Sequence, residues 1–388
     1  MKGKIKTTCY GLCAVLLGIG LQACEKQETP VDNLLTPQEE AFKKAVVPYV
    51  QNTVRPTYVA MADAAVDMAA KCVVMQTNFA AGKLTSADVE AAGKAWNEAR
   101  KYWEKSEAFL YGPANNHNID PHIDSWPLDK TALDNTLAKI RNGEAWSIET
   151  MGYGLLGFHS VEYMLFELIN DDTQSQARSI DKFTAEELKY LVAVAEDLRN
   201  QCVLLEACWS GMNNIAAAKQ QMLEEAELDY NENYGDMMMN AGQAGSIYKT
   251  YQETAEEIIQ GCIDIADEVG KTKIGRPANG SSEDDRNYIE SPYSLNSIVD
   301  FEDNMHSIEN SYFGTQAGDA SLSDYIKSVN PTLDTKVRTL LTESINTIKA
   351  IPEPFAKNAQ NVNAQKAVTL VGTDLVDALE EVMAELSK

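Results

Sequence analysis

Apolar residues recur at helical spacing over most of the chain from residue 36 onwards, and they nowhere alternate convincingly as in a strand. The 36–81 segment contains Pro48 and Pro56, so we expect its helix to be broken or kinked at those prolines. The pattern predicts further helices over 85–111, 128–142, 147–170, 184–209, 213–229, 241–269, 294–313, 331–349 and 363–387. The expected fold class is therefore all-α.

Capping and loop-forming residues indicate where these helices begin and end. Ser86 or Thr85 is placed to cap the 85–111 helix, and Thr184 with Glu187 fits a capping box. The segments 112–127 and 275–292 are rich in Gly, Pro, Asn and Asp. We expect both segments to be long loops.

The first 23 residues have the layout of a secretory signal. Three lysines precede the apolar run GLCAVLLGIGL at 11–21, which is about half the length that a membrane-spanning helix needs. The ending Leu21-Gln22-Ala23-Cys24 resembles a lipobox, although an ordinary signal peptide could contain a cysteine here by chance. We expect cleavage before Cys24 and a lipid on its thiol, which would hold the mature protein on a membrane of the cell envelope.

Length and charge narrow the classes of protein that the mature chain can belong to. Without residues 1–23 it has 30 basic and 58 acidic residues, a formal charge of −28. We do not expect a nucleic-acid partner, because phosphate binding requires a basic face. After a tether at 24–35, the length favours two helical-bundle-like domains, which we place at 36–230 and 231–388.

Four cysteines remain in the mature chain besides Cys24, namely Cys72, Cys202, Cys208 and Cys262. They could pair in an oxidising compartment, but they show no CxxC spacing of a metal site. Cys202 and Cys208 would be about 9 Å apart along one helix, too far for a disulfide. We therefore expect four buried thiols.

Two short motifs occur twice. HSVE at 159–162 recurs as HSIE at 306–309, and IDSWPLDKTALD at 123–134 aligns with IESPYSLNSIVD at 289–300. The offsets are 147 and 166 residues, so a duplication would require an insertion of 19 residues between the two matches. A diverged internal duplication of the bundle and a chance match are both open interpretations.

His159 and Glu162 are the first candidates for chemistry. They lie three residues apart on a predicted helix and therefore share one face. Gly157 just before them would let a neighbouring backbone or a ligand come close. The pair could bind a metal, or it could be a structural hydrogen bond at a helix interface.

Acidic residues in the 112–127 segment and beside it could complete a metal site. Oxygen ligands together with imidazole suit a hard cation such as iron. The candidates are Asp120, His122, Asp124 and Asp129, which cluster around Trp126, together with Glu104 and Glu107, which end the preceding helix. The alternatives are that Asp124 and Asp129 are N-caps, that Glu104 is solvated, that Trp126 is a core residue, and that His117 and His122 are surface residues.

GFHSVE at 157–162 fits the G-x-H-x-x-E motif, and the chain resembles the imelysin family around it. The resemblance extends to WNEARKYWEKSEAFLYGP, DSWPLD, GYGLLGFHSVEYMLF and ESPYSLNSIVDFEDNMHSIENSYFG, in the order of that family. It implies an all-helical fold of two bundle-like domains, a periplasmic or surface location and a link to bacterial iron uptake. The family pattern contains Gly157, His159 and Glu162 but not His306 and Glu309.

Together with the lipobox, this resemblance favours a lipid-anchored binding protein that passes iron or an iron complex to an uptake partner, and it implies a ligand site where the two domains meet, around His159 and Glu162. The expected ligand-binding residues are Gly157, His159, Glu162, Glu107 and Trp126, and the expected ligands to iron or another divalent metal are His159, Glu162, Asp124 and Asp129. The alternative is a metallopeptidase that uses His159 and Glu162, since the founding member of the family was described as an insulin-cleaving protease. The H-E-x-x-H motif of zinc proteases is absent from the sequence. A bundle that binds polysaccharide or a partner protein is a third interpretation.

Overall fold

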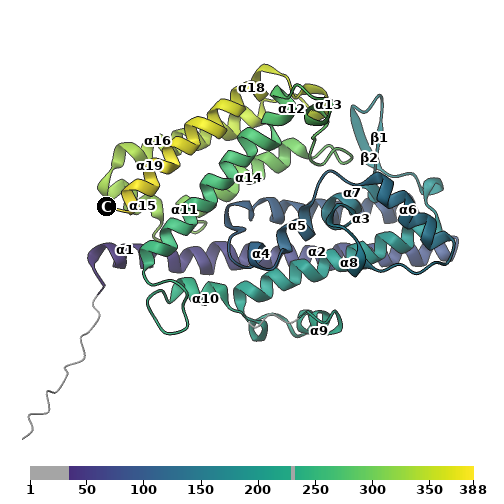
Figure 1. Cartoon of the computed structure of the whole chain (residues 1–388), viewed down its shortest axis with the longest axis horizontal. Helices are drawn as coiled ribbons and strands as arrows, with labels where there is room; N and C mark the ends of the chain where they lie inside the picture. Colours follow the sequence, from purple (N-terminus) through teal and green to yellow (C-terminus); the bar gives the residue numbers. More distant parts are fainter. Residues whose placement is uncertain (1–34, 229–231) are drawn as a thin grey trace, which may run out of the picture. The chain divides into compact units, whose positions relative to one another are not determined.

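Three long helices pack side by side in the first part of the fold (Figure 1). In this computed structural model, which describes residues 35–228 and 232–388, α2 (Arg55–Ala80) contacts both α3 (Ser86–Glu104) and α8 (Ala185–Ser210). Before α2, α1 (Pro37–Pro48) runs into the π-helical turn η1 (Tyr49–Val54). Proline lacks the amide hydrogen that a regular helix requires, so the irregular turn lies where the sequence predicts a kink.

A second group of helices packs around α11 (Tyr251–Asp267). This helix contacts α14 (Ser297–Phe313) and α19 (Val376–Leu386), and α14 also contacts α16 (Pro331–Lys349). The two groups meet where α14 contacts α3 and α11 contacts the short helix η2 (Glu107–Phe109). Residues Pro37–Lys388 form one compact unit, and the division of the chain at residue 230 stays a prediction.

The other described elements are short. Two are the π-helical turns η7 (Glu268–Lys273) and η8 (Leu370–Leu375). Two are the strands β1 (Phe166–Ile169) and β2 (Gln174–Ala177), which pair antiparallel with Phe166 opposite Ala177. The rest are α4 (Pro113–Asn116), α5 (Ile119–Asp124), α6 (Lys130–Arg141), η3 (Ile148–Thr150), η4 (Tyr153–Leu155), α7 (Gly157–Leu165), η5 (Ile180–Lys182), η6 (Met212–Asn214), α9 (Ala217–Glu225), α10 (Tyr234–Met239), α12 (Gly275–Asn279), α13 (Glu283–Arg286), α15 (Leu322–Val329), α17 (Phe355–Asn358) and α18 (Val362–Thr369).

The all-α class is confirmed, and the capping box of Thr184 and Glu187 is present at the start of α8. The predicted helix over 147–170 is wrong at both ends. It begins only at Gly157, whose φ of +72° does not continue a right-handed helix, and it ends at the β1–β2 hairpin, which the sequence pattern missed. Three successive turn residues after Ile169 adopt positive φ and reverse the chain.

The two predicted loops are also partly wrong, because each contains two short helices. The 112–127 segment forms α4 and α5, and the 275–292 segment forms α12 and α13. Pro113 does not prevent α4, because it is at the first helical position, where no amide hydrogen is needed. In addition, α15 was not predicted.

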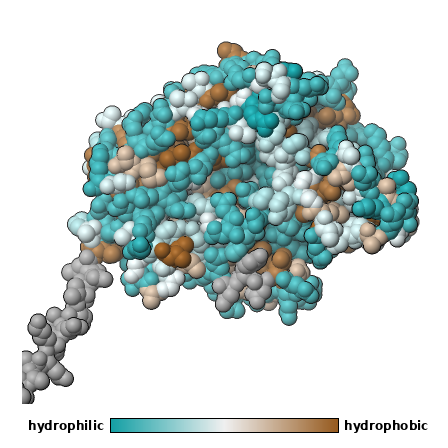
Figure 2. All heavy atoms as spheres, viewed as in Figure 1, coloured by the Kyte–Doolittle hydropathy of each residue, from teal (hydrophilic) through white to brown (hydrophobic). Residues whose placement is uncertain are grey.

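Hydrophilic residues dominate the face seen in Figure 2, and hydrophobic ones form small, scattered groups there. The cysteines Cys72, Cys202, Cys208 and Cys262 are buried and free, which confirms the expectation of buried thiols. Within the described residues, no helix is both long and apolar enough to span a membrane. The predicted signal peptide and Cys24 lie outside the described residues.

Candidate metal-binding site

A fully buried arginine contacts four carboxylates. Arg100 lies on α3, one turn before Glu104, and its side chain is 0% exposed. Its guanidinium lies 2.5 Å from Glu104 Oε1, 2.8 Å from Glu290 Oε1 and 3.4 Å from Asp300 Oδ2, and it also pairs with Asp124. Each of these carboxylates is almost completely shielded from water and needs compensating positive charge, and Arg100 contacts all four.

His159 lies between two carboxylates. Its Nδ1 donates to Glu162 Oε2 at 3.1 Å, so the two residues share one face of α7. Its Nε2 lies 3.1 Å from Asp124 Oδ1 but outside hydrogen-bond geometry. The other oxygen of Glu162, Oε1, accepts from the amides of Tyr293 and Ser294 at 2.9 and 2.7 Å. Glu162 therefore orients the imidazole and ties α7 to the segment that precedes α14.

A buried lysine extends this arrangement. Lys273 ends the π-helical turn η7, and its Nζ lies 3.1 Å from Glu290 Oε1, 3.3 Å from Glu107 Oε1 and 3.6 Å from Glu104 Oε2. We call the whole set the buried charge cluster, and its members are Arg100, Glu104, Glu107, Asp124, His159, Glu162, Lys273, Glu290 and Asp300. It contains six carboxylates and three bases, and burial raises the pKa of the Glu104 and Glu107 carboxyls well above their ordinary value, which limits its net negative charge.

Of the residues predicted from the sequence, Glu104, Glu107, Asp124, His159 and Glu162 belong to this cluster. Gly157 begins α7, two residues before His159. A Cβ on this glycine would lie 2.0 Å from the Ile123 carbonyl oxygen, so a neighbouring backbone does come close to it.

The structure does not bring Asp129 to the buried charge cluster. The residue is exposed and caps α6, with its Oδ1 accepting from the Ala132 amide at 2.9 Å. This capping role accounts for the side chain, because a helix start leaves amide hydrogens that need an acceptor. The expectation of Asp129 as a metal ligand therefore has no support from its position.

Aromatic and histidine side chains lie around the cluster. Trp126 is half-buried, with its ring centroid 6.4 Å from that of His159 and 3.9 Å from that of Tyr288. His122 is partly buried, and its Nε2 lies 2.8 Å from Asp197 Oδ2. His122 therefore makes a hydrogen bond to Asp197 on α8 and is only partly exposed.

Four members of the cluster were not predicted from the sequence: Arg100, Lys273, Glu290 and Asp300. A signal for Arg100 existed, because it lies four residues from Trp96 and three from Trp103 on the apolar face of its helix, where an arginine must be paired. Lys273 carried no such signal, since the π-helical turn that places it does not follow from the spacing of apolar residues.

Three members of the buried charge cluster have the donor set of a transition-metal site. Ligand-capable atoms of Asp124, His159 and Glu290 lie within 4.8 Å of one another. Both His159 Nε2 and Glu290 Oε2 are buried without a hydrogen-bond partner. An imidazole with two carboxylates suits iron and related divalent cations. Because Glu162 accepts the Nδ1 hydrogen, a neutral His159 would direct its Nε2 lone pair toward such a cation.

Electrostatics sets the protonation of the site. Burial lowers the pKa of His159, but its contacts with Asp124 and Glu162 outweigh burial and raise the pKa to about 9. Burial would raise the pKa of Asp124, but the Arg100 guanidinium and His159 hold it well below its usual range. In the metal-free protein at neutral pH, His159 is thus an imidazolium beside an ionised Asp124, and a bound cation has to displace its proton.

The raised pKa of His159 predicts how the stability of the metal-free protein depends on pH. Folding favours the protonated imidazole, so its contribution is complete below pH 6.5 and is lost as the pH rises through about 9. Over that range, we expect the wild type to lose about 3 kcal/mol more unfolding free energy than His159→Gln. Urea denaturation with a chelator present measures the difference.

The matched control is His306→Gln. His306 has the same spacing to a glutamate, with its Nδ1 2.7 Å from Glu309 Oε2, but its side chain is 31% exposed. His306→Gln should therefore change the pH dependence of the unfolding free energy much less than His159→Gln does. A wild type and His159→Gln variant with parallel pH profiles would contradict the assignment.

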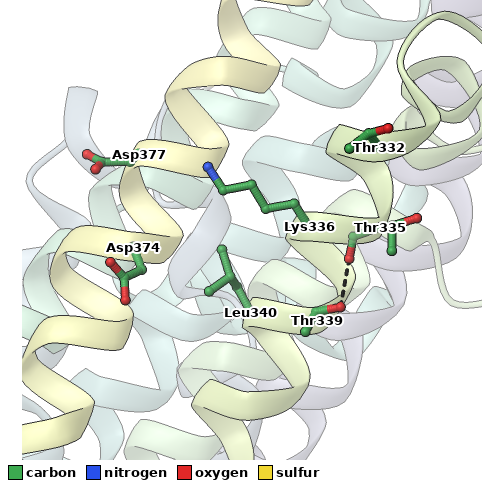
Figure 3. A pocket seen from close by; sticks show the side chains of 7 residues that line it. All are labelled: Thr332, Thr335, Lys336, Thr339, Leu340, Asp374 and Asp377. Atoms are coloured by element: carbon green, nitrogen blue, oxygen red, sulfur yellow. Dashed lines mark hydrogen bonds between the residues drawn. The ribbon is translucent and has the colours of Figure 1, made fainter.

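A separate groove of about 460 Å³ lies between α16 and the helix formed by η8 and α19 (Figure 3). Thr335, Lys336 and Thr339 line it from α16, with Asp374 and Asp377 on the other side. None of its lining residues belongs to the buried charge cluster. We therefore assign the chemistry to the cluster and not to this groove.

Comparisons with known proteins agree over most of the chain. The family model described as Imelysin matches residues 54–386. Iron-regulated protein A of Synechococcus elongatus is 26% identical over 382 residues, which cover 97% of this chain and 92% of the relative. A crystal structure named as an iron-regulated protein A precursor, from Parabacteroides distasonis, matches with a TM-score of 0.76 and 27% identity over 92% of this chain and 98% of that one. An imelysin-like protein of Psychrobacter arcticum has a TM-score of 0.57 at 13% identity over 90% and 94% of the two chains, which shows the fold alone.

Proposed function

The chain belongs to the imelysin family, and we propose that it is a lipid-anchored protein of the cell envelope that binds iron or an iron complex for uptake. Two relatives of nearly the same length are named iron-regulated protein A. The proposal includes a lipid on Cys24, a place on the outer membrane, and a partner protein that receives the ligand. The predicted signal peptide at 1–23, which ends in a lipobox-like sequence before Cys24, supports the first part.

The observation that carries the proposal is the convergence of Asp124, His159 and Glu290. They come from α5, α7 and the segment before α14, which are far apart in the sequence. Burying such groups costs free energy unless something compensates their charge. A bound cation would give partners to His159 Nε2 and Glu290 Oε2, which are buried without a hydrogen-bond partner.

Each residue has a distinct part in this proposal. Asp124, His159 and Glu290 would bind the cation, while Glu162 holds the imidazole in the tautomer that can do so. Arg100 and Lys273 keep the remaining carboxylates together when no cation is bound. Iron is the transported ligand here, so the site has to release it as well as bind it.

We test the proposal by titrating iron into residues 25–388 of the wild type, His159→Gln and Glu290→Gln, followed by calorimetry. Loss of a residue that only supports a metal ligand lowers metal affinity by about 10- to 100-fold. Either substitution here removes a ligand itself, so we expect iron affinity to fall by about 100-fold or more. Affinity in the wild type should rise with pH up to about 9, because binding displaces the proton of His159.

Asp129→Asn is the control, because this acid was expected as a ligand from the sequence but caps α6. It should bind iron as the wild type does. A wild type without iron affinity, or equal affinity in His159→Gln, would refute the proposal. Chelator-sensitive peptide cleavage that disappears in His159→Gln would favour the metallopeptidase alternative instead.

A further inference from the structure

A second group of metal-ligating side chains lies outside the buried charge cluster. His117 directly follows α4, Cys208 lies in the last turn of α8, and Glu232 precedes α10. One ligand atom from each lies within 4.8 Å of the other two. His117 Nε2 is already 2.9 Å from Glu232 Oε2. Three separate segments thus bring an imidazole, a thiol and a carboxylate together.

One of these three side chains is fully buried, and the other two are partly exposed. Cys208 is fully buried, whereas the side chains of His117 and Glu232 are 22% and 18% exposed. Burial and the nearby Glu232 raise the pKa of the Cys208 thiol to about 12, so without a cation it is an unreactive thiol. A metal ion reverses this situation, because a coordinating thiol is deprotonated.

The three ligand atoms are close to the spacing of a small tetrahedral site. Zinc binds thiolate sulfur at about 2.3 Å and imidazole nitrogen or carboxylate oxygen at about 2.0–2.2 Å, so its ligand atoms lie about 3.3–3.6 Å apart. The 2.9 Å between His117 and Glu232 would have to open slightly, and all three ligand atoms already lie within 4.8 Å of one another.

We propose that His117, Cys208 and Glu232 form a second metal site, which takes one divalent transition cation of borderline softness such as zinc. The thiolate makes this site softer than the oxygen-rich cluster around His159, so the two sites should prefer different metals. Water would complete the coordination, and binding would release the Cys208 thiol proton to solvent. The inference is independent of the proposed iron site, because the two sites share no residue.

Cobalt provides a direct test, since Co²⁺ replaces zinc and absorbs strongly when bound to thiolate. We would titrate Co²⁺ into the metal-free, reduced protein, residues 25–388, and follow the thiolate charge-transfer band. The wild type should develop the band at one equivalent, and zinc should abolish it. Cys208→Ser should eliminate the band, whereas Cys72→Ser, which changes an equally buried thiol, should keep it.

Further variants separate this site from a structural role and from the iron site. Glu232→Gln changes a partly exposed side chain and should fold, yet it should weaken cobalt binding by about ten-fold or more. His159→Gln should keep the band, even if the iron proposal fails. No band in the wild type, or a band that persists in Cys208→Ser, would overturn the inference and leave an ordinary hydrogen bond between His117 and Glu232 beside a buried thiol.

Discussion

Arg100→Met is expected to destabilise the folded protein by about 3–5 kcal/mol or to prevent folding, since it removes one partner of a buried ionic network. Methionine fills a similar volume, so the effect arises from charge and not from a cavity. Four carboxylates, those of Glu104, Asp124, Glu290 and Asp300, would lose their shared counter-charge in a region that excludes water. Urea denaturation, or the yield of soluble protein, measures the loss.

Arg141→Met is the matched control. Arg141 also pairs with a glutamate, Glu186, at 2.6 Å, but its side chain is 62% exposed. Exposed ion pairs contribute at most about 1 kcal/mol, so this variant should stay close to the wild type. If Arg100→Met were as stable as Arg141→Met, the carboxylates would have to be protonated in the native state, and the charge assignment of the cluster would be wrong.

The long helices could be predicted from the sequence because each carries enough apolar residues to define a face. The predicted 331–349 helix matches α16, and the predicted 184–209 helix matches α8 within one residue at each end. Short elements are different, since a helix of four residues such as α4 is stabilised by its surroundings and not by its own pattern. The positive φ of Gly157 likewise depends on the backbone that packs against it.

The candidate site was predictable only in part. His159 and Glu162 follow from one helix face, but their partners come from other segments, which periodicity does not bring together. The internal match of 123–134 with 289–300 contained a further signal, because it aligns Asp124 with Glu290 and Asp134 with Asp300. Asp124 and Glu290 both contact Arg100 and share the group around His159. The first aligned pair therefore belongs to one site, whereas in the second pair only Asp300 does, because Asp134 is exposed on α6.

The protonation of His159 affects both the stability of the metal-free protein and its affinity for iron, with opposite sign. The imidazolium of His159 stabilises the metal-free protein through Asp124 and Glu162. A cation at His159 Nε2 has to remove that proton, so it replaces one source of positive charge with another. Iron affinity and metal-free stability should consequently change with opposite sign as the pH rises toward 9, which a structural histidine without a ligand would not produce.

Gly157→Ala is expected to destabilise the protein by more than 3 kcal/mol and to abolish iron binding at the proposed site. A left-handed φ of +72° costs a non-glycine residue about 1–2 kcal/mol by itself. The added Cβ would also lie 2.0 Å from the Ile123 carbonyl oxygen, which cannot yield as a flexible side chain can. Moving Ile123 displaces Asp124, the next residue, while moving α7 displaces His159, so either response separates the ligands.

Gly82→Ala separates these two costs. Gly82 has a similar φ of +66°, but nothing lies within 4 Å of where its Cβ would be. This variant should lose only the conformational term of about 1–2 kcal/mol and should bind iron normally. Thermal unfolding and iron titration of both variants provide the measurement. Equal destabilisation by the two substitutions would mean that the close approach of Ile123 does not constrain α7. Retained iron affinity in Gly157→Ala would show that the positions of the ligands do not depend on this approach.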